Sequence, residues 1–94
     1  MVKHIVTWQF KEGTEEQVKD FLKGLQGLYG VIEVLRSVET GYNINPKEGI
    51  SGALICTFDN MADLNSYATD PRHLAVASKC KPIRTSRTAV DYEF

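Results

Sequence analysis

Residues 2–10 read Val2-Lys3-His4-Ile5-Val6-Thr7-Trp8-Gln9-Phe10, and the character of the side chain alternates along this stretch. The even-numbered positions are the more apolar ones: Val2, His4, Val6, Trp8 and Phe10. Alternation with many β-branched and aromatic residues is typical of a strand with one face turned toward a core. The chain is therefore expected to begin with a strand whose even-numbered side chains point inward.

A helix is expected after the turn at Glu12-Gly13. Thr14 and Gln17 have the spacing of a capping box, in which each side chain caps a backbone N–H of the first turn. Gly30 is a natural end for this helix. The apolar residues between follow the helical spacing of three and four: Val18, Phe21, Leu22, Leu25 and Leu28.

Three further strands follow from the same patterns. Residues 31–40 alternate, residues 50–58 are almost continuously apolar as in a central strand, and residues 88–94 form a last strand. Between the last two strands, Asn60 is placed to cap a short helix that carries Tyr67. Asp70-Pro71 then starts a second helix that carries His73, because an aspartate before a proline is a typical helix start.

The predicted order, β-α-β-β-α-β, is that of a ferredoxin-like α+β domain spanning residues 1–94. The first and third strands are read as parallel neighbours, which places His4 near Gly52. Helices in this topology cover one face of the sheet. The uncovered face would hold many apolar side chains, and a homodimer packed sheet to sheet would bury them. Its predicted residues are Ile5, Thr7, Gln9, Leu35, Ser37, Glu39, Ala53, Ile55, Thr57, Val90, Tyr92 and Phe94.

Composition excludes several functional classes. Eleven Lys and Arg residues against twelve Asp and Glu leave a net charge of −1, which disfavours nucleic-acid binding. No apolar run approaches the ~18 residues of a membrane span.

Cys56 and Cys80 are read as free buried thiols of a cytoplasmic protein, with a disulfide or redox role as the alternative. Two distant histidines give no zinc or iron pattern, although a surface Mg²⁺ stays open.

Several short motifs, in this order and spacing, resemble the stress-responsive α/β barrel (Dabb) family from end to end. They are the opening VKHIV, the turn FKEGT, the stretch VETG at residues 38–41, residues 54–58, Tyr67 with Asp70-Pro71-Arg72-His73, and Val90-Asp91-Tyr92. The resemblance implies a dimeric ferredoxin-like fold. It also implies a relationship to a plant polyketide cyclase of this family, which works by aldol condensation without metal or organic cofactor.

The catalytic residues of that cyclase resemble Tyr67 and His73, with an aspartate at the position of Asp91. Gly52 stands where that enzyme has a further pocket histidine, and Asp70 replaces the first histidine of the family's H-P-x-H motif. The imidazole of His73 suits a general base, Asp91 could hold its tautomer, and the Tyr67 hydroxyl could donate to an enolate oxygen. The alternative is that Tyr67 is core and that His73 bonds to a backbone carbonyl.

A pocket between sheet and helices is the expected ligand site. Arg36 and Arg87 fall on its buried register, where an arginine either faces a cavity or extends to water from a strand end. The basic cluster of Lys79, Lys81, Arg84 and Arg87 suggests either a solvated helix end or an anionic ligand at the pocket mouth. The predicted ligand-binding residues are His4, Val6, Trp8, Arg36, Val38, Gly52 and Leu54.

The leading hypothesis is a dimeric Dabb protein that binds a small apolar or aromatic carbonyl compound. Its activity would be a cofactor-independent proton transfer of cyclase or isomerase type. The first alternative is a non-catalytic stress-associated or assembly protein with no ligand. A dimeric monooxygenase-type barrel shares the topology and rests on fold analogy alone.

Overall fold

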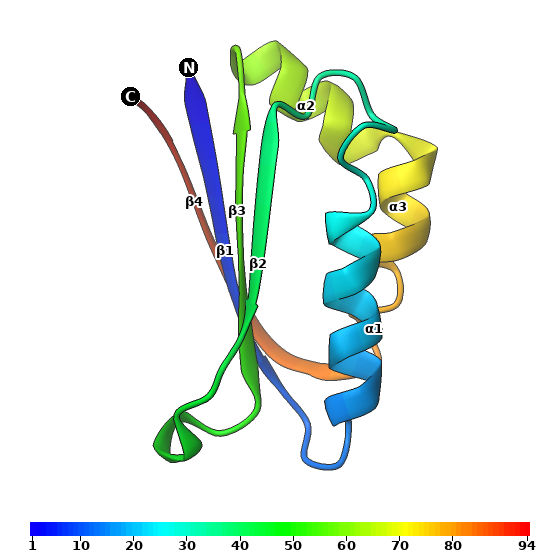
Figure 1. The fold of residues 1–94 in the computed structure, drawn as a ribbon, viewed down its shortest axis with the longest axis vertical. Helices are drawn as coiled ribbons and strands as arrows, with labels where there is room; N and C mark the ends of the chain where they lie inside the picture. Colours follow the sequence, from blue (N-terminus) through cyan, green and yellow to red (C-terminus); the bar gives the residue numbers. More distant parts are fainter.

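The computed structural model describes all residues, 1–94, as one antiparallel sheet covered on one face by helices (Figure 1). The sheet has the order β2-β3-β1-β4. Its strands are β1 (Val2–Phe10), β2 (Ser37–Tyr42), β3 (Ser51–Phe58) and β4 (Arg84–Glu93). The helices are α1 (Glu15–Gln26), α2 (Met61–Thr69) and α3 (Pro71–Ala77), with a 3-10 turn at Pro46–Glu48. The ferredoxin-like α+β fold is thereby confirmed.

The direction of β3 corrects one prediction. β1 and β3 are antiparallel neighbours, with His4 opposite Cys56 and Trp8 opposite Gly52. The crossover through α1 leaves β2 running in the same direction as β1, and the hairpin between β2 and β3 then reverses the chain. His4 therefore does not lie near Gly52.

The core lies between the sheet and the helix layer. The even-numbered residues of β1 face it, as the alternation predicted, and Val6 and Trp8 are almost fully buried. Trp8 meets Phe21 of α1 edge to face, with ring centroids 5.2 Å apart. Cys56 and Cys80 are buried free thiols, and burial raises the pKa of Cys56 to about 12.

Both ends of α1 differ from the prediction. The Thr14 side chain makes no capping bond, because its hydroxyl donates instead to the Lys11 carbonyl at 2.6 Å. The helix ends at Gln26 with Gly27 as its C-cap, and Gly30 takes a positive φ of 84° in the turn that follows. Gly24 has a packing role, because a Cβ there would lie 3.0 Å from Val76 of α3.

The predicted strand at residues 31–40 was wrong over its first half. Residues 31–34 form turns and residues 35–36 are irregular. Ile32 and Leu35 pack against the core and are each only 3% exposed. The backbone N–H of Ile32 bonds to the Leu28 carbonyl, and that of Leu35 bonds to the Ile32 carbonyl. The segment thus passes in turns from the helix layer to the edge of the sheet, where β2 begins. Leu35 therefore belongs to the core and not to the uncovered face.

Two capping side chains set the helices α2 and α3, as predicted. Asn60 accepts from the backbone N–H of Asp63 at 2.8 Å, and Asp70 accepts from that of Arg72 at 2.8 Å. Arg72 binds Asp70 through two guanidinium nitrogens, which together with the capping bond hold the pKa of Asp70 down at about 2. Arg72 also donates to the Val31 carbonyl at 2.9 Å, which ties the start of α3 to the segment after α1.

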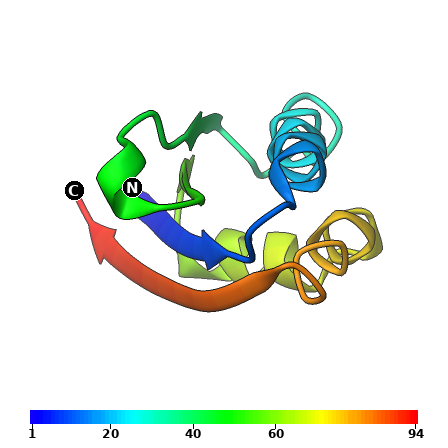
Figure 2. The same ribbon diagram turned by 90° about the horizontal axis from the view of Figure 1, so that it is seen from below.

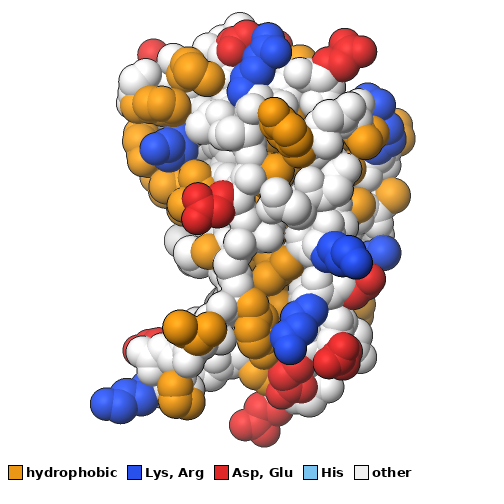
Figure 3. Space-filling model, viewed as in Figure 1, with side chains coloured by type: hydrophobic (Ala, Val, Ile, Leu, Met, Phe, Trp, Pro, Cys, Tyr) orange, Lys and Arg blue, Asp and Glu red, His pale blue; other side chains and the backbone are white.

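The other face of the sheet is uncovered, because all three helices lie on one side (Figures 1 and 2). Val90, Tyr92 and Phe94 of β4 and the C-terminus are 52%, 43% and 60% exposed. Apolar side chains gather along the edge where β1 and β4 lie (Figure 3). Lys3 lies among them, with its Nζ 4.6 Å from the ring centroid of Phe94. None of the helices is long and apolar enough to cross a membrane.

Candidate functional site

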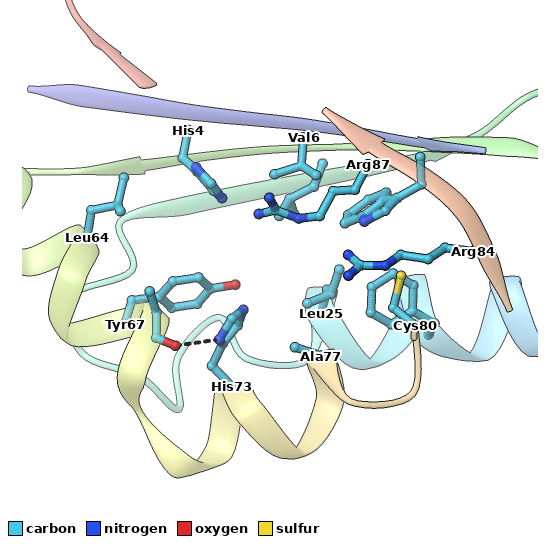
Figure 4. A pocket seen from close by; sticks show the side chains of 14 residues that line it. His4, Val6, Leu25, Leu64, Tyr67, His73, Ala77, Cys80, Arg84 and Arg87 are labelled. Carbon is cyan, nitrogen blue, oxygen red and sulfur yellow. Dashed lines mark hydrogen bonds between the residues drawn. The ribbon is translucent and has the colours of Figure 1, made fainter. Parts of the chain in front are cut away.

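A cavity of about 120 Å³ lies between the sheet and the helix layer (Figure 4). An engineered cavity of ~150 Å³ holds benzene, so this one has room for a ligand of roughly six non-hydrogen atoms. Side chains of β1, β3 and α1 form its apolar walls, and polar groups converge on it from β1, α2, α3 and β4. The lining residues are His4, Val6, Trp8, Phe21, Leu25, Leu54, Leu64, Tyr67, Ala68, His73, Ala77, Cys80, Arg84 and Arg87.

Tyr67 is in the last turns of α2 and is only 1% exposed. Its ring packs against Phe58, with centroids 5.1 Å apart, as the core interpretation predicted. Its hydroxyl, however, is buried without a hydrogen-bond partner and points into the cavity (Figure 4). Burial raises the pKa of the phenol, so the group stays protonated and is a free donor at the cavity wall.

His73 lies in the first turn of α3, with its ring centroid 4.3 Å from that of Tyr67. Its Nδ1 is 3.2 Å from the Ala68 carbonyl oxygen, which can only accept, so Nδ1 carries the proton and Nε2 keeps its lone pair. The Nε2 side of the ring turns toward the cavity (Figure 4). Burial lowers the pKa of His73, and the nearby His4 and Arg87 lower it further, so the imidazole is neutral at pH 7.

Asp91 bonds to His4 and not to His73, which corrects its predicted role. His4 on β1 and Asp91 on β4 are opposite each other in the antiparallel register, and the Asp91 carboxylate contacts Nδ1 of His4. The sequence alone could not reveal this pair, because the two residues are 87 positions apart. Asp91 therefore orients the histidine on the sheet side of the cavity, and the Ala68 carbonyl orients His73.

Two arginines complete the polar lining from β4. Arg87 was predicted on the inward register and does line the cavity. Arg84 lines it as well, because the pairing of β1 with β4 shifts by one residue: Gln9 is opposite Ser86, yet Phe10 is opposite Arg84. This β-bulge leaves Thr85 as an extra residue and turns Arg84 to the same face as Arg87. The basic cluster was the only sequence signal for Arg84.

Three predicted ligand-binding residues lie outside the cavity. Arg36 precedes β2 and forms a two-bond ion pair with the exposed Asp59, which explains why it extends to water. Val38 is half-buried and packs against the edge of the core. Gly52 faces α1, and a Cβ there would lie 3.2 Å from the Gly41 carbonyl oxygen and 3.3 Å from Leu22, so the space on its inward side is filled.

The other predicted ligand-binding residues, His4, Val6, Trp8 and Leu54, do line the cavity. Sequence patterns did not indicate Ala68 and Ala77 as cavity residues. Their small side chains leave the space open. No group of three or more His, Cys, Asp or Glu side chains is arranged to hold a metal ion.

The family model of the stress responsive A/B barrel domain (Dabb) matches residues 2–94. This chain belongs to the Dabb family. The Arabidopsis thaliana stress-response A/B barrel domain-containing protein At5g22580 is 32% identical over 76 residues, covering 77% of this chain and 67% of that protein.

Solved structures share the whole fold of this Dabb domain. A dimeric ferredoxin-like protein of unknown function from Bacteroides fragilis is 38% identical with a TM-score of 0.89, and the match covers 99% of this chain and 95% of that one. The hydroxynitrile lyase of Passiflora edulis has a TM-score of 0.82 at 21% identity, with coverage of 97% and 90%. At that identity the likeness to the lyase shows the fold alone.

The unpartnered hydroxyl leads to a test by stability. Replacing Tyr67 with Phe removes a buried donor that has no acceptor, so the free energy of unfolding is expected to rise by ~1 kcal/mol. Urea denaturation measures this change, and Tyr29→Phe, at an exposed tyrosine, is the control with no expected effect. A loss of stability in Tyr67→Phe would show that the hydroxyl bonds within the folded protein.

Proposed function

We propose that this Dabb protein binds a small carbonyl compound in the cavity and moves a proton at the carbon next to the carbonyl group, without a cofactor. The observation that carries the proposal is the pairing of Tyr67 and His73. One presents an unused O–H donor and the other an unused nitrogen lone pair, and both line the same cavity. These are the two groups that enolate formation requires.

The proton moves from the α-carbon of the ligand to Nε2 of His73. The electron pair of the broken C–H bond moves onto the carbonyl oxygen, where negative charge develops. The Tyr67 hydroxyl donates to that oxygen, and because its pKa is raised it stabilises the charge without being ionised. His4, held by Asp91, lies across the cavity. It can return a proton at a second carbon, as an isomerase reaction needs, or at the oxygen of the carbonyl group that the enolate carbon attacks, as an aldol cyclisation needs.

The lowered pKa of His73 supports the role of base. A general base must be unprotonated at the working pH, and a half-buried imidazole beside Arg87 meets this condition near neutrality. The apolar walls lower the effective dielectric constant around these groups, so each of these polar interactions is stronger than it would be in bulk water. That a solved structure with the same fold is named a hydroxynitrile lyase shows that the fold accommodates an enzyme.

We also propose that the protein is a homodimer that packs through the uncovered sheet face. Related structures are described as dimeric, and the apolar residues of β4 are exposed in the single chain. Covering this face would remove them from water while leaving the cavity on the opposite side of the sheet. The two buried free thiols support a cytoplasmic location, where thiols stay reduced.

The activity is tested by hydrogen–deuterium exchange at carbon. Butanone and pyruvate, each of no more than about six non-hydrogen atoms, are incubated with the protein in D₂O and followed by ¹H NMR. We expect catalysed exchange of the protons next to the carbonyl in at least one compound. His73→Gln should slow it by roughly 100-fold or more, and Tyr67→Phe by a similar factor.

Tyr29→Phe is the matched control and should keep the full rate. If neither compound exchanges its protons faster with folded than with heat-denatured protein, the catalytic proposal is contradicted. The non-catalytic stress-associated or assembly role then remains as the function.

The dimer is tested by sedimentation equilibrium at micromolar concentration. We expect a species of twice the 10.6 kDa chain mass. Tyr92→Glu places a charge on the uncovered face and should shift the protein to the monomer, whereas Tyr29→Glu, outside that face, should not. A wild-type protein that sediments at 10.6 kDa would contradict the dimer.

A further inference from the structure

We infer that the ligand carries a carboxylate group and that Arg84 and Arg87 bind it. The inference rests on the proposed function in taking the cavity as the ligand site, and it adds the chemical class of the ligand: a short-chain oxo acid. Arg84 and Arg87 then determine specificity, while His73 and Tyr67 act on the carbonyl end.

The β-bulge is the first observation. Without the extra residue Thr85, regular alternation along β4 would put Arg84 and Arg87 on opposite faces of the sheet. The shift in register brings Phe10 opposite Arg84 and keeps Trp8 opposite Arg87, so both guanidinium groups are on the helix side. Figure 4 shows them reaching from β4 toward the space beside His4, Tyr67 and His73.

The second observation is that neither arginine has an acidic partner. The four ion pairs of the chain involve His4, Arg36, Arg72 and Lys79, and the side chains of Arg84 and Arg87 make no hydrogen bonds. No Asp or Glu is among the lining residues, and Asp91 is bonded to His4. The cavity therefore holds two positive charges without a counter-charge.

Two like charges beside an apolar cavity repel each other and favour a bound anion. A carboxylate matches the planar fork of a guanidinium group, which donates two parallel hydrogen bonds to it. Arg84 is half-buried and Arg87 is exposed, so an anion can reach the pair from solvent.

The size of the cavity limits the rest of the ligand. A volume of about 120 Å³ leaves room for a carboxylate and a few further atoms. The Tyr67 hydroxyl is the donor available for a carbonyl oxygen at the other end of such a molecule. An oxo acid of about three carbons supplies both groups.

Butanoate and butanamide test the inference, because they have nearly the same shape and differ in charge. Trp8 is the only tryptophan and lines the cavity, so its fluorescence reports binding, and calorimetry gives the affinity. We expect wild-type protein to bind butanoate at least about tenfold more tightly than butanamide. Arg84→Gln and Arg87→Gln should each remove most of this preference.

Lys81→Gln is the matched control, since it removes a positive charge from the same basic cluster outside the cavity, and it should keep the preference. Should Arg84→Gln fail to fold, as judged by circular dichroism, Arg87→Gln carries the same test. Equal affinity of wild-type protein for butanoate and butanamide would overturn the inference. So would a loss of the butanoate preference in Lys81→Gln as large as in the arginine variants. If the protein prefers butanoate but catalyses no exchange of carbon-bound protons, the inference about the arginines is upheld and the catalytic proposal is rejected.

Discussion

The interruption between α2 and α3 at Asp70-Pro71 is the feature on which the site depends. Tyr67 and His73 are six residues apart, and on a continuous helix their side chains would point about 120° away from each other. The interruption redirects the axis and brings the two rings to a centroid distance of 4.3 Å. Asp70 holds this geometry by capping α3, and Arg72 anchors it to the Val31 carbonyl. The same interruption frees the Ala68 carbonyl to orient His73.

The sheet supplies the opposite wall and the charge. Antiparallel pairing of β1 with β4 places Asp91 beside His4, and the bulge at Thr85 turns Arg84 inward with Arg87. The helix-facing side of the sheet therefore carries both the apolar side chains that pack in the core and the two positively charged side chains of Arg84 and Arg87. The opposite side carries exposed apolar residues of β4, which suits association with a second chain. Ligand and partner thus use different faces of one sheet.

The features that the sequence predicted correctly depend on residues that are close together along the chain. The alternation from Val2 to Phe10 and the capping signals at Asn60 and Asp70 each depend on neighbours within a few residues, and all three were confirmed. Local signals failed at Thr14, at Gly30 and in residues 31–36. The other errors concern long-range pairing. The direction of β3, the contact of Asp91 with His4 and the inward turn of Arg84 depend on which strands meet and in what register. Apart from the basic cluster that contains Arg84, composition and spacing carry no signal for these features.

A crystal structure of the protein grown with butanoate tests the central claim most directly, namely that the space above the sheet is a ligand chamber with a cationic end. We expect butanoate in that space, with its carboxylate within hydrogen-bonding distance of the guanidinium groups of Arg84 and Arg87 and its carbon chain toward the Tyr67 hydroxyl. A structure in which protein side chains fill the space, and in which that hydroxyl bonds to a protein acceptor, would contradict the account.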